Sequence, residues 1–253
     1  MVDARNLTDV LSRRHAILRV LSESPRERHE LVDEFDDAKS TVYKGVSQLE
    51  NLGLLEHTGE GLRPTLFGVA ALRRYEELAR TADLASFLTD LPPDAIDAEV
   101  FVGSELVAPR TEDVDRHLNR ARTLLTEAEV VRGVVPAASS DNVAIVRDRT
   151  AAGQLTAEFV LTTELVGVLR REMPGTLETL LDGGVTLWET EEDVPFGTYV
   201  ARGRTKTRMA IEFRDGNLVT GLLLNDTAES LQWAEDQFKR YRENAKRVQE
   251  ADL

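Results

Sequence analysis

Apolar residues recur at helical spacing through most of the first 90 positions, and one stretch between them alternates apolar and polar residues instead. The helical spacing indicates four amphipathic helices, and the alternating stretch indicates a short two-stranded hairpin. In chain order, the predicted elements are helices over 7–22, after Pro25 and over 40–52, strands over 54–57 and 62–64, and a helix over 66–88. Gly53 follows the third helix, where a glycine readily adopts the left-handed conformation that ends a helix.

The fourth predicted helix carries an apolar stripe that two kinds of packing explain. The stripe consists of Ala71, Tyr75, Leu78, Ala82, Ala85 and Leu88. It belongs either to the core of the first domain or to a helix interface between two copies of the chain. The sequence Asp90-Leu91-Pro92-Pro93 follows, and two consecutive prolines end a helix and stiffen a linker. We therefore predict a first domain over residues 1–90 and a second over residues 96–253.

Beyond the prolines, strand-like and helix-like segments alternate. The predicted strands lie at 130–135, 155–161, 185–189, 198–201, 207–213 and 218–224. The predicted helices lie at 112–127, 141–152 and 228–248, with a helix pair over 164–181 that Pro174-Gly175 interrupts. This alternation is typical of strands that pair in parallel through helical crossovers. Asp215-Gly216 separates the last two strands and predicts a tight hairpin. The expected fold is an α+β N-terminal winged helix-turn-helix followed by an α/β domain with a mixed sheet.

The composition is strongly acidic and changes how the charge is interpreted. Among 253 residues there are 45 aspartates and glutamates against 31 lysines and arginines, a formal net charge of -14. Such a charge by itself argues against nucleic acid, whose phosphates attract cations. Arginine supplies most of the cations, and scarce lysine with excess acid indicates adaptation to molar salt. The Debye length there falls to about 3 Å, so local charge says more about partners than net charge does.

The composition excludes several broad classes of protein and of functional site. There is no cysteine, which excludes disulfides and thiolate metal sites. The first thirty residues lack an apolar signal core, and no apolar run approaches the roughly 20 residues that a membrane span needs. We therefore expect a soluble, cytoplasmic protein with no membrane partner.

The third predicted helix has the composition of a DNA-recognition helix. In a helix-turn-helix, the second helix of the motif enters the major groove and its outward side chains meet the bases. Helical spacing turns Val42, Val46 and Leu49 inward. The outward candidates for DNA contact are Lys39, Ser40, Thr41, Tyr43, Lys44, Ser47 and Gln48. No acidic residue occurs between Asp37 and Glu50, which favours an approach to phosphates.

The hairpin supplies one more candidate. Arg63 lies on its second strand, where it would reach the minor groove or a flanking phosphate. The alternative for the whole first domain is a three-helix module of the same spacing that binds another protein. Local charge favours DNA, because lysine and hydroxyl side chains suit both phosphate oxygens and base contacts.

Several segments resemble a known family. Residues 38–55 (AKSTVYKGVSQLENLGLL) resemble the recognition helix and first wing strand of archaeal winged-helix regulators, and Thr65-Leu66-Phe67-Gly68 resembles the opening of their fourth helix. Four downstream segments resemble the C-terminal domain of the methanogenesis-regulator, or filament-formation regulator, family of archaeal, notably haloarchaeal, transcription factors. They are VRGVVP at 131–136, FVLT at 159–162, VPFG at 194–197 and LQWA at 231–234. The resemblance covers nearly the whole chain.

This resemblance implies a dimeric transcription regulator whose second domain is similar to half of a phospholipase-D-like fold, as in TrmB-type sugar regulators. Enzymes of that fold carry a His-x-Lys-(x)4-Asp motif. None of His15, His29, His57 and His117 is followed two residues later by lysine. Histidine pairs at metal-ligand spacing are also lacking. We therefore expect no catalytic residues, no cofactor and no metal.

A sensor site is expected in the second domain, because ligands of α/β sheets bind beyond the carboxyl ends of the strands. The candidate effector residues are Arg132, Pro136, Thr162, Thr163, Phe196, Arg204 and Lys206. Ordinary structural roles are the alternative, since Thr163 is equally suited to cap the next helix.

Four cations recur at every second residue: Arg202, Arg204, Lys206 and Arg208. An extended backbone would gather them into one cationic stripe, which could grip a phosphorylated effector, flanking DNA or an acidic neighbour. A hairpin turn near Gly203 would instead leave merely solvated charges, and we favour the turn.

Together these observations predict a sequence-specific regulator that binds double-stranded DNA as a homodimer, with a second domain that senses a small-molecule effector or mediates oligomerisation. Two alternatives stay open. One is a protein-interaction adaptor that uses the winged helix, and the other is an enzyme built on the second domain with the winged helix as a tether.

Overall fold

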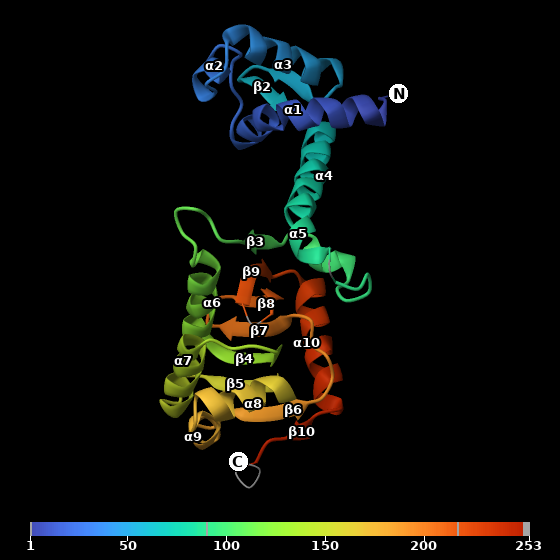
Figure 1. Ribbon diagram of the computed structural model, residues 1–253. Coiled ribbons are helices and arrows are strands. Elements are labelled where there is room, and N and C mark those ends of the chain that lie inside the picture. The colour runs from blue at the N-terminus through green and yellow to red at the C-terminus, as the bar shows by residue number, and fades with distance from the viewer. Residues whose placement is uncertain (1, 90, 217, 250–253) are drawn as a thin grey trace. The chain divides into compact units, whose positions relative to one another are not determined.

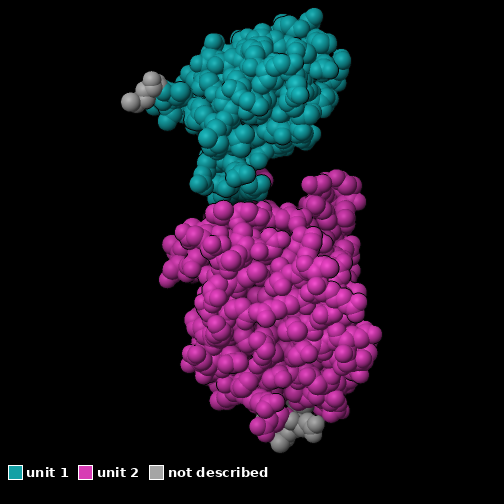
Figure 2. Space-filling view, turned by 180° about the vertical axis from the view of Figure 1, so that it is seen from behind, with its two compact units in different colours: residues 1–82 teal, residues 83–253 magenta. Residues whose placement is uncertain are grey.

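The computed structural model describes residues 2–89, 91–216 and 218–249. The chain divides into two compact units, residues 1–82 and 83–253, which Figure 2 distinguishes by colour. The sequence prediction places the division several residues later, at residues 90–96. Leu84, which is 1% exposed, packs with Ile96 in a core of the second unit. Of the predicted linker, Asp90 lies outside the described residues.

The first unit has the predicted order of helices and hairpin (Figure 1). Its elements are α1 (Ala4–Glu23), α2 (Glu30–Glu34), α3 (Lys39–Asn51), β1 (Leu55–Thr58), β2 (Gly61–Pro64) and α4 (Leu66–Asp83). Their apolar faces meet in a core in which Leu18, Val46 and Leu62 are fully buried. Arg26 extends the hairpin, because its backbone exchanges hydrogen bonds of 3.2 and 2.8 Å with Leu62.

Thr65 and Gly68 fix the entry into α4. The Thr65 hydroxyl donates to the carbonyl oxygen of Gly53 at 2.7 Å and accepts from the backbone N–H of Gly68 at 3.0 Å. A Cβ added at Gly68 would lie 2.1 Å from the Leu54 carbonyl oxygen, so no larger residue fits between this helix and the start of the hairpin. The predicted fourth helix begins correctly but ends too late, because α4 stops and a separate α5 (Ala85–Leu88) follows.

In the described residues of the second unit, an eight-stranded mixed sheet has the order β10-β6-β5-β4-β7-β8-β9-β3. Its strands are β3 (Glu105–Val107), β4 (Ala128–Val135), β5 (Thr156–Thr162), β6 (Thr186–Thr190), β7 (Gly197–Gly203), β8 (Thr207–Asp215), β9 (Leu218–Asn225) and β10 (Lys246–Arg247). Strands β4, β5 and β6 run parallel, as the alternating pattern predicted, and the other neighbours pair antiparallel.

Helices cover both faces of this sheet (Figure 1). Besides α5, they are η1 (Ala98–Phe101), α6 (Arg116–Glu127), α7 (Ser140–Ala151), α8 (Thr163–Glu172), α9 (Thr176–Asp182) and α10 (Ala228–Glu243). Helices α6 to α9 share one core with the sheet, and α5, η1 and α10 pack on the opposite face. Central strand residues such as Val131 and Val134 are fully buried because both faces are covered.

The chain's end differs from the sequence prediction. The predicted final helix extended to Val248, but α10 ends at Glu243 and β10 pairs with β6 instead. The backbone N–H of Val248 donates to the Leu187 carbonyl at 3.0 Å, and its side chain is buried in the core that includes Leu187. The predicted hairpin at Asp215-Gly216 is confirmed, with a positive φ of 58° at Gly216.

Candidate functional site

Helix α3 presents the predicted polar face. Val42, Val46 and Leu49 are buried, as the spacing predicted. The outward candidates are either fully or partly accessible: Lys39, Ser40 and Lys44 are exposed, and Thr41, Tyr43, Ser47 and Gln48 are half-buried. All seven therefore lie on the accessible side of one helix.

Among the residues that the structure describes, no carboxylate is paired with the two lysines of α3. Lys39 Nζ lies 5.3 Å from the centroid of the Tyr43 ring, which holds the ammonium group over the ring face. Within the described part of the chain, neither Lys39 nor Lys44 forms an ion pair. Glu50, the first acid after them, is already paired with Arg28 and with His57 Nε2 at 2.8 Å. Both lysines are therefore free to meet phosphate oxygens.

Gln48 is held in place by the first helix. Arg14 Nε donates to Gln48 Oε1 at 3.1 Å, which leaves the amide nitrogen of Gln48 as a donor. Gly45 allows this approach of α1 and α3, because a Cβ there would lie 2.8 Å from Ile17 Cδ1 and 3.0 Å from Arg14 Cδ. The close packing of the two helices thus orients one of the predicted base contacts.

Arg63 lies on the exposed hairpin but is occupied. Its Nε donates to Glu56 Oε1 at 2.8 Å across β1 and β2. An anion would have to compete with this carboxylate for Arg63.

Charge is unevenly divided between the two units. Residues 1–82 carry 12 lysines and arginines against 14 aspartates and glutamates, whereas residues 83–253 carry 19 against 31. The net charge of -14 is therefore -2 in the first unit and -12 in the second. The acidity that argued against nucleic acid lies almost entirely outside the unit that carries α3.

The second unit contains an apolar cavity of about 70 Å³ toward the carboxyl ends of the parallel strands. Its walls come from both the sheet and helices α7 to α9, and include Val135, Val143, Phe159, Leu165 and Leu187. This is where ligands of α/β sheets bind.

Glu212 and Tyr199 are the titratable groups among the described residues that line this cavity. The Tyr199 hydroxyl donates to Glu212 Oε1 at 3.2 Å, and the glutamate is only 8% exposed. Burial raises the pKa of Glu212 to about 7, although the hydrogen bond from Tyr199 opposes the shift. Burial, with the nearby carboxyl, raises the pKa of Tyr199 well above its ordinary value.

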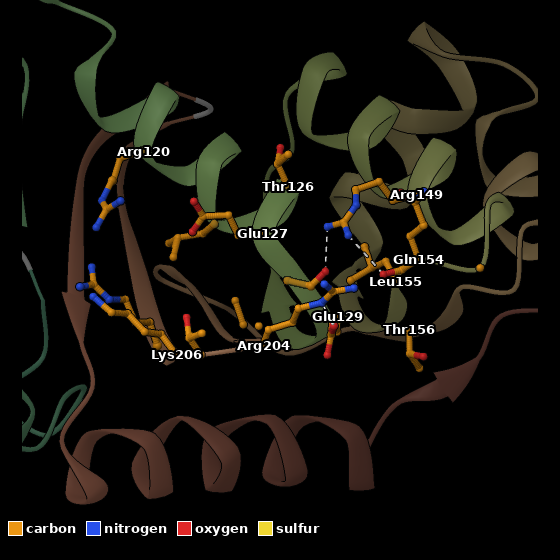
Figure 3. Close-up of a pocket in the computed structure, with 17 residues that line it drawn as sticks. Arg120, Thr126, Glu127, Glu129, Arg149, Gln154, Leu155, Thr156, Arg204 and Lys206 are labelled. Atoms are coloured by element: carbon orange, nitrogen blue, oxygen red, sulfur yellow. Dashed lines mark hydrogen bonds and ion pairs between the residues drawn. The ribbon is translucent and has the colours of Figure 1, made fainter.

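A wide, polar cleft of about 1040 Å³ lies at the other end of the sheet, beside the starts of β4 and β5 (Figure 3). Arg204 and Lys206 line it, so two predicted effector residues share one cleft. Most of its cations are already bound: Arg204 Nε pairs with Glu129 at 3.0 Å, and Arg149 donates to three backbone carbonyls at 2.7, 2.7 and 3.2 Å.

The cationic stripe that a continuous extended backbone would give does not form. Strand β7 ends at Gly203, whose N–H donates to the Lys206 carbonyl at 2.9 Å, and β8 begins at Thr207. A tight turn therefore interrupts the extended backbone between Arg202 and Arg208, as the favoured alternative predicted. Arg202 turns to Glu235 of α10 at 2.6 Å, while Arg208 lies 3.6 Å from Glu105 of β3.

The other five predicted effector residues have structural partners. Arg132 Nε lies 3.3 Å from Glu158 Oε2, and the buried Phe196 ring stacks with Trp233 at 6.3 Å on the α10 face. Thr162 accepts from the N–H of Leu165 and so caps α8. Thr163 donates to the Thr190 carbonyl at 3.3 Å, and Pro136 is buried beside Gly197.

These seven residues are not gathered in one cavity. Pro136 and Thr162 lie at the carboxyl ends of the parallel strands, whereas Arg204 and Lys206 lie at the opposite end. Sequence reasoning missed Glu212 and Tyr199. The available signal was one acid inside the apolar run of β8, between Ile211 and Phe213.

Among the described residues, no group of three histidines or carboxylates is placed to hold a metal ion. In that same part of the chain, no helix combines the length and apolar character that crossing a membrane requires.

Two family models match the chain. The HVO_A0261 N-terminal domain matches residues 2–86, and the middle domain of the methanogenesis regulatory protein FilR1 matches residues 114–244. No curated protein matches the sequence.

One similar solved structure is that of TrmBL2, an archaeal chromatin protein described as showing a novel mode of DNA binding. It is 12% identical to this chain with a TM-score of 0.43, and the match covers 97% of this chain and 100% of that chain. Nuc, a phospholipase D family member from Salmonella typhimurium, is 9% identical with a TM-score of 0.44, over 58% of this chain and 99% of that chain. NucT from Helicobacter pylori is 13% identical with a TM-score of 0.42, over 57% and 98%. At these low values the likenesses are distant.

Proposed function

The chain belongs to the family of the methanogenesis regulatory protein FilR1, and from this premise we propose that it is a DNA-binding transcription regulator of the cytoplasm. The observation that carries the proposal is the polar face of α3, which holds two lysines free of carboxylate partners and no acid before Glu50. In this proposal the first unit is a winged helix-turn-helix, α3 enters the major groove, and the β1–β2 hairpin is the wing.

The regulator acts as a homodimer in this proposal. Two copies of α3 would meet successive major grooves about 34 Å apart. Exposed apolar side chains on α4 support a helix interface between copies, because Phe67 is 41% and Leu78 is 61% exposed. An effector bound to the second unit would change the geometry of the two winged helices, which is a coupling between distinct sites.

Catalysis is not part of the proposal. The histidine of the second unit, His117, is buried, and its Nε2 lies 2.9 Å from the Val219 carbonyl oxygen. In this proposal His117 therefore has a packing role.

The test is DNA binding by the full chain in molar potassium chloride, measured by fluorescence anisotropy with promoter fragments from its own genome. Lys44→Glu and Tyr43→Ala are expected to reduce affinity at least tenfold. Lys246→Glu is the matched control, because that lysine is 88% exposed on β10 and pairs only loosely with Glu191, at 3.7 Å. Undiminished binding by both α3 variants, or an equal loss with the control, would overturn the proposal.

A further inference from the structure

The apolar cavity of the second unit has a chemically unusual wall. Most of its described lining is aliphatic or aromatic, yet the Glu212 carboxyl lies in that wall. Tyr199 donates a hydrogen bond to Oε1 of this carboxyl, and the described lining holds no lysine, arginine or histidine to balance its charge. A buried carboxylate without a cation is costly unless something else compensates it.

A second hydrogen-bond acceptor, on Asn142, also indicates a place for a ligand that donates hydrogen bonds. Asn142, in the first turn of α7, also lines the cavity, and its Oδ1 is a buried atom with no hydrogen-bond partner among the described residues. Buried polar atoms normally have partners, so an orphan acceptor on a cavity wall marks a place for an external donor. The cavity thus offers two acceptors, one of them acidic, on an otherwise apolar surface.

We propose that this cavity is the effector site and takes a small apolar molecule that carries a protonated amino group. The ammonium group would donate to Glu212 and Asn142 while its hydrocarbon part contacts Val143 and Leu165. The volume of about 70 Å³ is several times the roughly 10–15 Å³ that one water needs, which suits a ligand of a few heavy atoms. The role as an effector rests on the proposed regulatory function, whereas the binding itself does not.

The direct test is calorimetric titration of the full chain with three molecules of nearly the same shape: isobutylamine, isobutanol and isobutyrate. At pH 8 in molar potassium chloride, we expect the amine to bind at least tenfold more tightly than the alcohol and the acid not to bind. Equal affinity for amine and alcohol, preference for the acid, or no binding by any of the three would overturn the ligand class.

Two variants separate the site from general charge effects. Glu212→Gln is expected to weaken amine binding at least tenfold. Glu235→Gln is the matched control, because it removes a carboxylate from α10 on the opposite face of the sheet. Undiminished amine binding by Glu212→Gln would overturn the site. The melting temperature of each variant, measured without ligand, shows that it is folded.

The pH dependence gives a further readout. Tyr199 is the other titratable group on the described wall, and its pKa lies well above neutral, so Glu212 alone titrates there. The amine stays protonated below about pH 9, by analogy with lysine. Amine affinity is therefore expected to weaken as pH falls below about 7, because Glu212 must first lose its proton. A pH-independent affinity between pH 5.5 and 8 would contradict the proposed contact.

Anisotropy titrations with DNA, with and without saturating amine, then test the regulatory role. A change in DNA affinity supports the effector role. Amine binding without any change in DNA affinity leaves the amine site in place and overturns its role as the effector site. Absence of DNA binding under all conditions overturns the proposed function and with it the effector role, whereas amine binding to the cavity is judged by the calorimetric titration.

Discussion

Arg63 Nε and Glu56 Oε1 lie 2.8 Å apart across the β1–β2 hairpin, and this ion pair withholds the hairpin's arginine from other anions. Glu56→Gln is expected to raise DNA affinity two- to fivefold, since an exposed pair of this kind is worth about 0.5–1 kcal/mol. Anisotropy at fixed salt measures the change. The gain should vanish in an Arg63→Ala background, and a gain that persists there would show that Glu56 acts by its charge alone.

Gly68 lets α4 pack against the start of the hairpin. Gly68→Ala would place a Cβ 2.1 Å from a backbone oxygen, so we expect a loss of about 1–3 kcal/mol or more in the free energy of unfolding. Gly167→Ala in α8 is the control, because its Cβ would meet only the flexible end of Arg171 at 3.3 Å. That variant should match or exceed the wild type by up to about 1 kcal/mol, from helix propensity. Urea unfolding measures the stability of both full-length variants. Equal stability of the two variants would refute the steric explanation.

Thr65 connects the end of α3 to the start of α4 through two hydrogen bonds of its hydroxyl. Thr65→Val keeps the shape and removes both bonds, so we expect a loss of about 1–2 kcal/mol in unfolding free energy. Thr65→Ser should retain most of the stability because the hydroxyl remains. Thermal unfolding followed by circular dichroism distinguishes the two, and a serine variant as unstable as the valine variant would show that the methyl group matters instead.

Periodicity predicted most of the element order, because long amphipathic helices and alternating strands leave a repeated pattern. It missed β3 and β10, which have three and two residues and are too short to show a period. It also extended the last helix to Val248, because an apolar residue at that position suits a helical stripe as well as a strand. On α3 the buried and exposed faces were predicted correctly because spacing alone decides them.

The site in the second unit was harder to predict, because it depends on strand pairing. Strand β7 runs antiparallel to β4, so the turn with Arg204 and Lys206 falls at the opposite end from Pro136. Glu212 stands among apolar residues of β8, but its bond to Tyr199 follows only from the register of β7 and β8. No local pattern in the sequence specifies that register.

Glu212 should make stability depend on pH. Its pKa is about 7 in the folded chain against 4.5 when unperturbed, so the folded state holds the proton more tightly. This contribution to stability is fully present below about pH 4.5 and is lost as pH rises to about 7, by about 3 kcal/mol in all. Glu212→Gln should therefore exceed the wild type in stability above pH 7, and the difference should shrink toward pH 4.5.

Chemical denaturation of the variant and the wild type at several pH values measures that difference in stability. The contribution of the other acids cancels in the difference, because both proteins contain them. Glu235→Gln serves again as the control and should show no such trend. A constant difference between the Glu212 variant and the wild type across this range would mean that the carboxyl is not desolvated.

The two-residue strand β10 closes one margin of the large sheet. Lys246 and Arg247 pair with Glu189 and Trp188 of β6, and both cations are exposed. Charged side chains on a very short outer strand discourage a further strand from adding there. Strand addition from a second molecule is therefore disfavoured along this border of the sheet.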